Sequence, residues 1–137
     1  MRTRDQKLAA EIFGQVSELA DLSETKRKKY GSMAHKAPAL IRTAGLTQAL
    51  AFIDARGDQA QHILLDHIAQ VTGFNTRGEL LHQSRTANLN EYMALSQRVM
   101  NALLWYKRFA QSVLGVEQGT EAEEALEEGG SYDTVSP

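Results

Sequence analysis

The sequence contains no cysteine among its 137 residues. It can therefore form no disulfide and offers no thiolate as a nucleophile or metal ligand, which is typical of a protein from a reducing compartment. It also lacks any apolar run approaching the roughly 18 residues that a membrane-spanning helix needs. Its opening, MRTRDQKLAAEIFG, lacks the apolar stretch of a signal peptide. These absences predict a cytoplasmic protein without a membrane partner.

Catalytic patterns are missing as well. There is no glycine-rich phosphate loop, no nucleophile elbow and no pair of carboxylates at a catalytic spacing. His62 and Asp66 lie one helical turn apart, a workable metal-ligand spacing, but a metal site needs three or four ligands and no matching second pair stands nearby. We interpret them as hydrogen-bonded neighbours and expect no catalytic residue, no metal and no cofactor. An enzyme would instead require activity that is lost when His62 or Asp66 is changed.

Strand-like alternation of apolar and polar residues is absent too, whereas helical periodicity runs along the chain to about residue 116. We therefore predict an all-α protein, a compact bundle of about five to six helices followed by a disordered acidic tail. The first helix should begin at Thr3, with Gln6 completing a capping box. Pro38 should kink or restart the second helix, because it removes a backbone donor.

The other boundaries follow from capping residues and glycines. The expected helices run from Ser23 or Glu24 to Gly45, from Leu46 to Gly57, from Asp58 to about Gly73, over residues 78–84, and from Asn88 or Asn90 to about Val116. Each ends at a residue that favours a turn, so the connections between helices should be short.

The last helix carries more apolar residues than one core face can use. On a helical wheel with 100° per residue, five of them share the core face: Leu95, Val99, Tyr106, Phe109 and Val113. Met100 and Leu104 fall on the far side, and Trp105 falls on one flank. Such a helix is either central in its fold, which we favour, or half-covered by a partner. Met100, Leu104 and Trp105 are therefore our candidates for a protein interface.

Charge is unevenly distributed along the chain. All 15 Lys and Arg residues lie at or before Arg108, whereas seven of the 17 acidic residues lie from Glu117 onward. Residues 1–116 therefore carry a net charge of +5, and residues 117–137 carry −7. We expect a helical domain over residues 1–116 and a flexible acidic tail over residues 117–137, whose few apolar side chains cannot offset the entropy of ordering. Such a charge split suggests a nucleic-acid partner.

Four basic residues in succession, Lys26 to Lys29, begin the second helix. Cations near a helix N-terminus oppose its dipole, so local stability does not explain them, whereas contact with phosphate would. On a helical wheel the charges fall on two flanks: Lys29 with Lys36, and Lys28 with His35 and, if the helix continues through Pro38, Arg42. A solvated, charged helix start is the alternative interpretation.

Three segments of the sequence, taken in their order along the chain, resemble a known protein family. They are RTRDQKLAAEIF near the start, KKYGSMAHKAPALIRTAGLTQALAFI over residues 28–53, and YMALSQRVMNALLWYKRFA near the end of the helical part. In this order they resemble the small-subunit family of the type III-B (Cmr) CRISPR effector complex. The similarity covers roughly residues 2–114, and the acidic tail lies outside it.

This resemblance implies a compact helical bundle without an active site. Members of the family stack head to tail as a minor filament along the backbone subunits that carry the CRISPR RNA, and they help to hold the duplex of guide and target RNA. The implied partners are the backbone subunits, further copies of the chain, and CRISPR RNA and target RNA within the complex. The candidate RNA contacts are Lys26, Arg27, Lys29, Lys36, Arg42, Lys107 and Arg108. The alternative is a helical adaptor that binds only protein partners.

Overall fold

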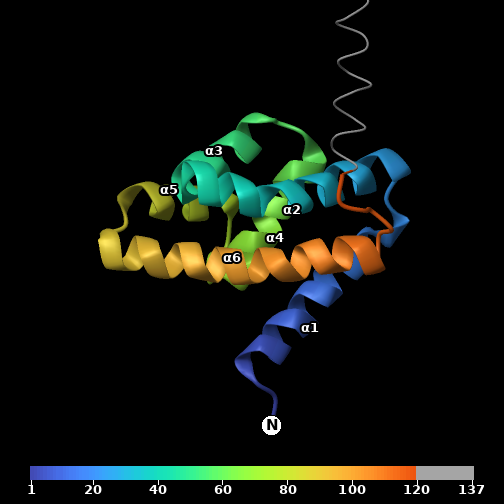
Figure 1. The fold of residues 1–137 in the computed structure, drawn as a ribbon, viewed down its shortest axis with the longest axis horizontal. Helices are drawn as coiled ribbons and strands as arrows, with labels where there is room; N and C mark the ends of the chain where they lie inside the picture. Colours follow the sequence, from blue (N-terminus) through green and yellow to red (C-terminus); the bar gives the residue numbers. More distant parts are fainter. Residues whose placement is uncertain (120–137) are drawn as a thin grey trace, which may run out of the picture.

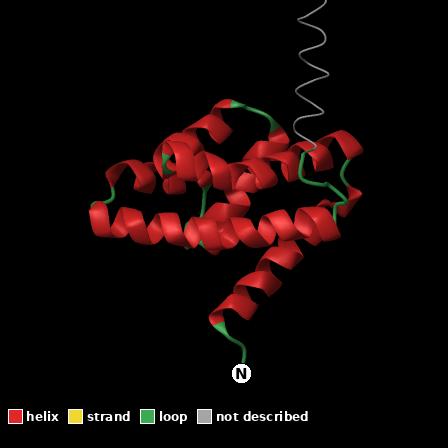
Figure 2. Cartoon of the chain, in the orientation of Figure 1, coloured by secondary structure: helices red, strands yellow, loops and turns green. Residues whose placement is uncertain are grey.

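The computed structural model describes residues 1–119, and within that range helices are the only regular secondary structure (Figure 2). The elements are α1 (Arg4–Ser17), the 3-10 helix η1 (Glu18–Asp21), α2 (Glu24–Ala44), α3 (Leu46–Ala55), α4 (Gln59–Val71), α5 (Arg77–Thr86) and α6 (Leu89–Ser112). The predicted all-α class is therefore confirmed. From residue 120 onward, the predicted acidic tail lies outside the described residues.

The helix starts follow the predicted caps. Thr3 and Gln6 form the capping box of α1: the Gln6 N–H donates to Thr3 Oγ1 (3.0 Å), and the Thr3 N–H donates to Gln6 Oε1 (2.8 Å). Asp58 and Asn88 cap α4 and α6, each with a side-chain oxygen that accepts from a backbone N–H. Such a cap satisfies a donor that the helix itself cannot pair and is worth about 1 kcal/mol.

Two predicted boundaries differ from the structure. Of the two outcomes that we expected at Pro38, a kink or a restart, the restart does not occur: α2 continues as one helix to Ala44, because Ala37 and Pro38 are buried and tertiary packing outweighs the missing backbone hydrogen bond. α6 ends at Ser112 rather than at Val116. Gly115, with a φ of 70°, turns the chain so that Val116 folds back onto α2.

The long helices α2 and α6 lie side by side and antiparallel across the middle of the molecule (Figure 1). α1 and α4 also pack against α6, but Leu104 on its far side is 54 % exposed, so α6 buries one side only and the central position that we favoured from its composition is wrong in part. Its predicted core face is buried at Leu95, Val99 and Tyr106 and half-buried at Phe109 and Val113. The N-terminal half of α1 projects from the body (Figure 1). No helix in the described part of the chain combines the length and apolar character needed to cross a membrane.

One polar network crosses the apolar core and joins four helices. The Tyr30 hydroxyl of α2 lies 2.8 Å from Nδ1 of His67 on α4, and the His67 ring stacks on the ring of Tyr106 on α6. The Tyr106 hydroxyl donates to Oε1 of Gln15 on α1. Gln15 Nε2 in turn donates to the His67 carbonyl oxygen (3.2 Å) and to Gln70 Oε1 (3.1 Å). The network therefore connects α1, α2, α4 and α6 around two fully buried tyrosines.

Burial sets the protonation states within this network. Desolvation lowers the pKa of His67 from 6.5 to about 4, with the nearby Asp66 carboxylate acting in the opposite direction. His67 is therefore neutral at neutral pH, and its Nδ1 can accept the hydrogen bond of the Tyr30 hydroxyl. Burial also raises the pKa of Tyr30 and of Tyr106 well above the usual value for tyrosine, so both hydroxyls stay protonated.

Val116 packs on α2 through a close approach of the backbone. A Cβ atom added to Gly31 would lie 2.6 Å from the Val116 Cβ, so glycine is what leaves room for this side chain. The Val116 carbonyl accepts a hydrogen bond from His35 Nε2 (2.8 Å), and its N–H donates to the Ala110 carbonyl oxygen of α6 (2.9 Å). The segment after α6 therefore ties the end of that helix to the middle of α2.

We expect Gly31→Ala to destabilise the protein by about 1 to 3 kcal/mol, because the new Cβ overlaps Val116 and forces the segment away from α2. Gly14→Ala is the matched control. Gly14 is an exposed helical glycine with no heavy atom near an added Cβ, so this substitution should stabilise by about 0.5 to 1 kcal/mol. Urea denaturation followed by circular dichroism measures both. A Gly31→Ala protein as stable as the wild type would contradict the close approach.

The lowered pKa of His67 predicts a stability that falls in acid. Between about pH 6.5 and about pH 4 the unfolded state binds a proton at this histidine that the folded state does not. The free energy of unfolding therefore decreases as the pH falls through this window, by up to about 3 kcal/mol. His67→Gln keeps an acceptor for Tyr30 but cannot titrate, so it should lose less stability. Urea denaturation at about pH 6.5 and about pH 4 measures the free energy of unfolding of the wild type and of His67→Gln. An equal loss of stability in the two proteins would rule out His67 as the source of the pH dependence.

Candidate nucleic-acid and protein interfaces

Three residues of the basic run have partners within the chain: Lys28 with Glu24 (3.3 Å), Lys29 with Asp58 (3.2 Å), and Arg27 with the Ala20 carbonyl oxygen (3.0 Å). The expectation that local stability does not explain the run is therefore wrong in part. Asp58 is also the N-cap of α4, so Lys29 links the start of α2 to the start of α4. These pairs lie at the surface, where each contributes less than about 1 kcal/mol.

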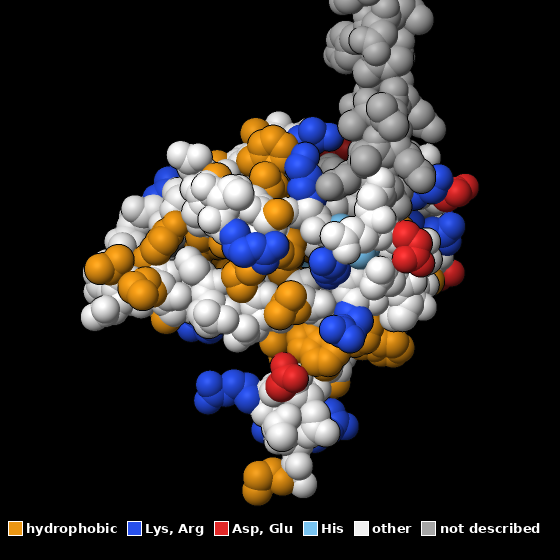
Figure 3. Space-filling view, viewed as in Figure 1, with side chains coloured by type: hydrophobic (Ala, Val, Ile, Leu, Met, Phe, Trp, Pro, Cys, Tyr) orange, Lys and Arg blue, Asp and Glu red, His pale blue; other side chains and the backbone are white. Residues whose placement is uncertain are grey.

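The remaining cations of α2 and α6 are available to an outside partner. Within residues 1–119, no side-chain hydrogen bond or ion pair engages four of the candidates: Lys26, Arg42, Lys107 and Arg108. Arg42 and Arg108 are exposed, and Lys26 and Lys107 are half-buried. Figure 3 shows Lys and Arg side chains in separate groups over the face that carries α2 and α6, with few acidic side chains between them. The cations form a scattered positive surface rather than one patch.

The second predicted flank of α2 exists but is interrupted. Because α2 continues through Pro38, Arg42 shares a face with Lys28 and His35. His35, however, is only 6 % exposed, because Val116 covers it and accepts its Nε2 hydrogen bond. The expectation that His35 belongs to an exposed basic flank is therefore wrong, and Lys28 and Arg42 are the members of this flank that reach solvent.

Lys36 takes part in a cluster that the sequence analysis missed. Its Nζ lies 5.1 Å from the centroid of the Phe52 ring, and the Arg56 guanidinium lies 5.9 Å from the same centroid. The ring is 38 % exposed, so two cations and one aromatic face share the surface, a combination that suits single-stranded nucleic acid. The i, i+4 spacing of Phe52 and Arg56 is visible in the sequence, but the approach of Lys36 from another helix is not.

Some of the apolar residues of α6 outside its core face contact other helices, and others are exposed. Trp105 stacks on Phe109 with 5.5 Å between the ring centroids, and its Nε1 donates to Asp5 of α1 (3.1 Å). Met100 is half-buried against the core, whereas Leu104 is 54 % exposed. Of the three predicted interface residues, Trp105 therefore fastens α1 to α6, and Leu104 is the one that is most available to a partner.

Two further residues add to the exposed apolar surface of α6. Leu89 and Met93, in the first turns of α6, are 72 % and 61 % exposed. On a helical wheel they fall within about 60° of Met100 and Leu104, so the four side chains follow one side of the helix. We call Leu89, Met93, Met100 and Leu104 the α6 stripe. The same wheel would have found Met93 from the sequence alone, and Leu89 with Asn88 as the N-cap, one of the two starts that we predicted.

His62 and Asp66 do not pair with each other. His62 Nε2 lies 3.1 Å from the Asp54 carbonyl oxygen, and Arg77 Nη1 donates to both carboxylate oxygens of Asp66 at 3.2 Å. Within residues 1–119, no group of three or more His, Cys, Asp or Glu side chains is placed to hold a metal ion. Both residues therefore make structural contacts, but with other partners than the ones we expected.

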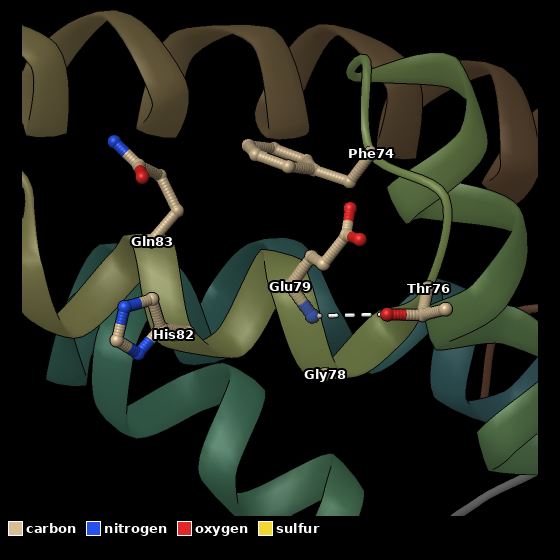
Figure 4. Close-up of a pocket in the computed structure, with 6 residues that line it drawn as sticks. All are labelled: Phe74, Thr76, Gly78, Glu79, His82 and Gln83. Atoms are coloured by element: carbon tan, nitrogen blue, oxygen red, sulfur yellow. Dashed lines mark hydrogen bonds between the residues drawn. The ribbon is translucent and has the colours of Figure 1, made fainter.

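An open groove of about 560 Å³ lies beside α5 (Figure 4), lined by Phe74, Thr76, Gly78, Glu79, His82 and Gln83. Its polar groups cap α5: the Glu79 N–H donates to Thr76 Oγ1 (3.1 Å), and the Glu79 carboxylate accepts from the Asn75 N–H (3.0 Å). His82 points away from Phe74 and Gln83 (Figure 4). The groove therefore does not bring an acid and a base together over one substrate.

Comparisons with known proteins bear on the whole helical part of the chain. Residues 4–113 match the family described as CRISPR-associated protein (Cas_Cmr5). The CRISPR system Cmr subunit Cmr5 of Thermus thermophilus is 43% identical over 114 residues, which span 83% of this chain and 98% of the relative. The crystal structure of a CRISPR-associated Cmr5 family protein from Thermus thermophilus matches with a TM-score of 0.77 at 43% identity, over 82% of this chain and 98% of that chain. This chain therefore belongs to the Cas_Cmr5 family of CRISPR-associated proteins.

Proposed function

We propose that this protein is a non-catalytic small subunit of a type III-B CRISPR effector complex in the cytoplasm. The observation that carries the proposal is the family match over residues 4–113, and the 43% identical relative, a subunit of the Cmr system, supports it. The partners are then the backbone subunits of the complex, further copies of this chain, and the CRISPR RNA and target RNA. Within the complex, the subunit helps to hold the duplex of guide and target RNA.

The proposed RNA surface consists of the candidate cations of α2 and α6 whose side chains have no ion pair within residues 1–119: Lys26, Arg42, Lys107 and Arg108. Residues 1–119 contain 15 basic and 11 acidic residues, a net charge of +4. Basic side chains that are not already paired lose little when they bind phosphate, and the counterions that they release from the RNA favour binding. Contacts of this kind fix a duplex in place without reading its sequence. That property suits a subunit that must accept many different guides.

The α6 stripe supports assembly with protein. Its members Leu89, Met93 and Leu104 are exposed on one side of a helix whose other side fills the core. Exposed apolar side chains that share one side of a helix are typical of a protein–protein interface. We assign the α6 stripe to contacts of the minor filament, in which this subunit meets a further copy of itself or a backbone subunit.

A holding role requires no catalytic group in this subunit. The residues with the best catalytic spacing, His62 and Asp66, are engaged with Asp54 and Arg77. We therefore assign cleavage of RNA and signalling to other subunits of the complex.

Arg42→Glu combined with Lys107→Glu should weaken the capture of target RNA by the assembled complex, because both side chains offer unpaired charge to phosphate. The loss should be largest at low salt. The slope of log affinity against log salt should flatten by roughly 0.7 to 0.9 for each phosphate contact that is lost. Neither side chain has an ion pair within residues 1–119, so folding should be unchanged. Filter binding over a salt series measures the slope.

Arg85→Glu combined with Arg98→Glu is the matched control for this experiment. Both are exposed arginines without an ion pair in the described part of the chain, and Arg98 lies on the opposite side of α6 from Lys107. The change in charge is the same, so this variant should keep the wild-type slope. An unaltered slope in the Arg42→Glu, Lys107→Glu variant would instead favour a helical adaptor that binds only protein.

Met93→Glu and, separately, Leu104→Glu should reduce incorporation into the complex while the isolated chain stays folded. Both side chains are more than half exposed before assembly, and a carboxylate in an apolar contact carries a large desolvation cost. Ala94→Glu is the control, because Ala94 is exposed on the same helix but turned about 100° away from Met93. Co-purification with the other subunits reports assembly, and circular dichroism reports folding. Wild-type incorporation of both variants would remove the α6 stripe from the interface.

A further inference from the structure

The described chain leaves the folded body beside α2. Val116 is 3 % exposed, its N–H donates to the Ala110 carbonyl oxygen, and its carbonyl accepts from His35 Nε2. Residues 117–119, which follow, are exposed. The point from which the chain continues is therefore fixed next to the middle of α2 and the last turns of α6.

Three cations lie on the two helices that flank this point. Lys28 lies one helical turn before Gly31, about 4.5 Å away along the axis of α2. On the same face of α2, Arg42 lies about 10.5 Å beyond His35. Lys107 lies on α6, one turn before the residue whose carbonyl accepts the Val116 N–H. We call Lys28, Arg42 and Lys107 the exit cations.

Within residues 1–119 one ion pair engages an exit cation, and the acidic residue Glu117 directly follows Val116 at the exit. Lys28 Nζ lies 3.3 Å from Glu24 Oε1 at the surface, where an ion pair is worth less than about 1 kcal/mol and exchanges readily. Arg42 and Lys107 have no ion pair in residues 1–119. The helices on either side of the place where the chain leaves the body therefore offer separate positive charges, which favour an anionic partner.

The sequence that follows is complementary to this surface. Residues 120–137 contain six acidic residues and no basic one, and five of the six stand close together: Glu121, Glu123, Glu124, Glu127 and Glu128. Glu124 is connected to Gly119 by a stretch of chain that spans at most about 18 Å when fully extended. The first carboxylates are thus close enough in sequence to reach the exit cations.

We propose that the acidic segment 121–128 binds the exit cations of its own chain. Because the two partners are joined by a short stretch of chain, their effective concentration is high, on the order of millimolar. Each ion pair is weak and screened by salt, so the contact forms at low ionic strength and is lost as the salt concentration rises. The family match ends at residue 113, so the acidic segment lies outside the part of this chain that matches the family.

The contact also regulates RNA binding, and this part of the inference rests on the proposed function. Arg42 and Lys107 are shared between the carboxylates and the phosphates of RNA, which carry charge of the same sign. RNA must displace the acidic segment before it binds. The segment therefore opposes the binding of stray RNA by the free subunit more than the binding of a guided duplex, which offers many phosphates at once.

Carbodiimide cross-linking of the full chain tests the contact without RNA. The reagent couples a carboxylate to a lysine amine that touches it, so mass spectrometry should find links from residues 121–128 to Lys28 and Lys107 at low salt. The ion pair of Lys29 with Asp58 (3.2 Å) is the internal positive control. Lys7, an exposed lysine on the N-terminal half of α1, is the negative control.

Links that concentrate on Lys28 and Lys107 and disappear at high salt are the expected result. Links from residues 121–128 that reach Lys7 as often as the exit cations would overturn the proposal. So would the absence of links from residues 121–128 in a sample in which Lys29 and Asp58 are joined.

A variant of the full chain in which glutamine replaces all five glutamates of residues 121–128 tests whether the acidic segment competes with RNA for the exit cations. We expect this variant to bind a single-stranded RNA of arbitrary sequence about fivefold more tightly than the wild type at low salt, and equally at high salt, because several weak, screened pairs are removed. An unchanged affinity would reject the competition. If neither protein binds RNA, the proposed RNA surface fails, whereas the cross-links still decide whether the contact exists.

Discussion

The hydrogen bond between the Tyr30 hydroxyl and His67 Nδ1 joins α2 to α4 inside a core that is otherwise mostly apolar. Through the ring of Tyr106 and the amide of Gln15, the same network also holds α6 and α1. A buried polar group that loses its partner costs about 1 to 3 kcal/mol, so the network favours the one arrangement of four helices in which its members are all paired. This arrangement fixes how the surfaces of α2 and α6 lie relative to each other.

α2 and α6 can present these surfaces because each helix buries one side and leaves the other free. Val116 closes the space between them over His35, and the close approach at Gly31 makes this closure possible. A subunit that holds RNA through many weak phosphate contacts needs cations at fixed spacings, because contacts on elements that shift apart do not act together. The proposed function therefore depends on the rigidity of the core, which keeps the cations of α2 and α6 at fixed spacings.

Local patterns in the sequence are sufficient to predict the helices, N-caps such as Thr3 and Asp58, and the core face of α6, because capping and periodicity depend on residues a few positions apart. The polar network could not be predicted, since its side chains come from four helices. For the same reason the ion pair of Lys29 and the burial of His35 became visible only in the folded chain. The α6 stripe beyond Leu104 is different: its other exposed members lie on the same helical wheel and were accessible from the sequence.

A cryo-electron microscopy reconstruction of the assembled complex with guide and target RNA would decide whether one rigid helical subunit presents α2 to RNA and the α6 stripe to protein. We expect phosphate oxygens within salt-bridge distance, about 4 Å, of Arg42 and Lys107, and we expect Leu104 to be buried against a neighbouring protein subunit. A reconstruction in which Arg42 and Lys107 lie far from any phosphate while the α6 stripe faces solvent would contradict both assignments.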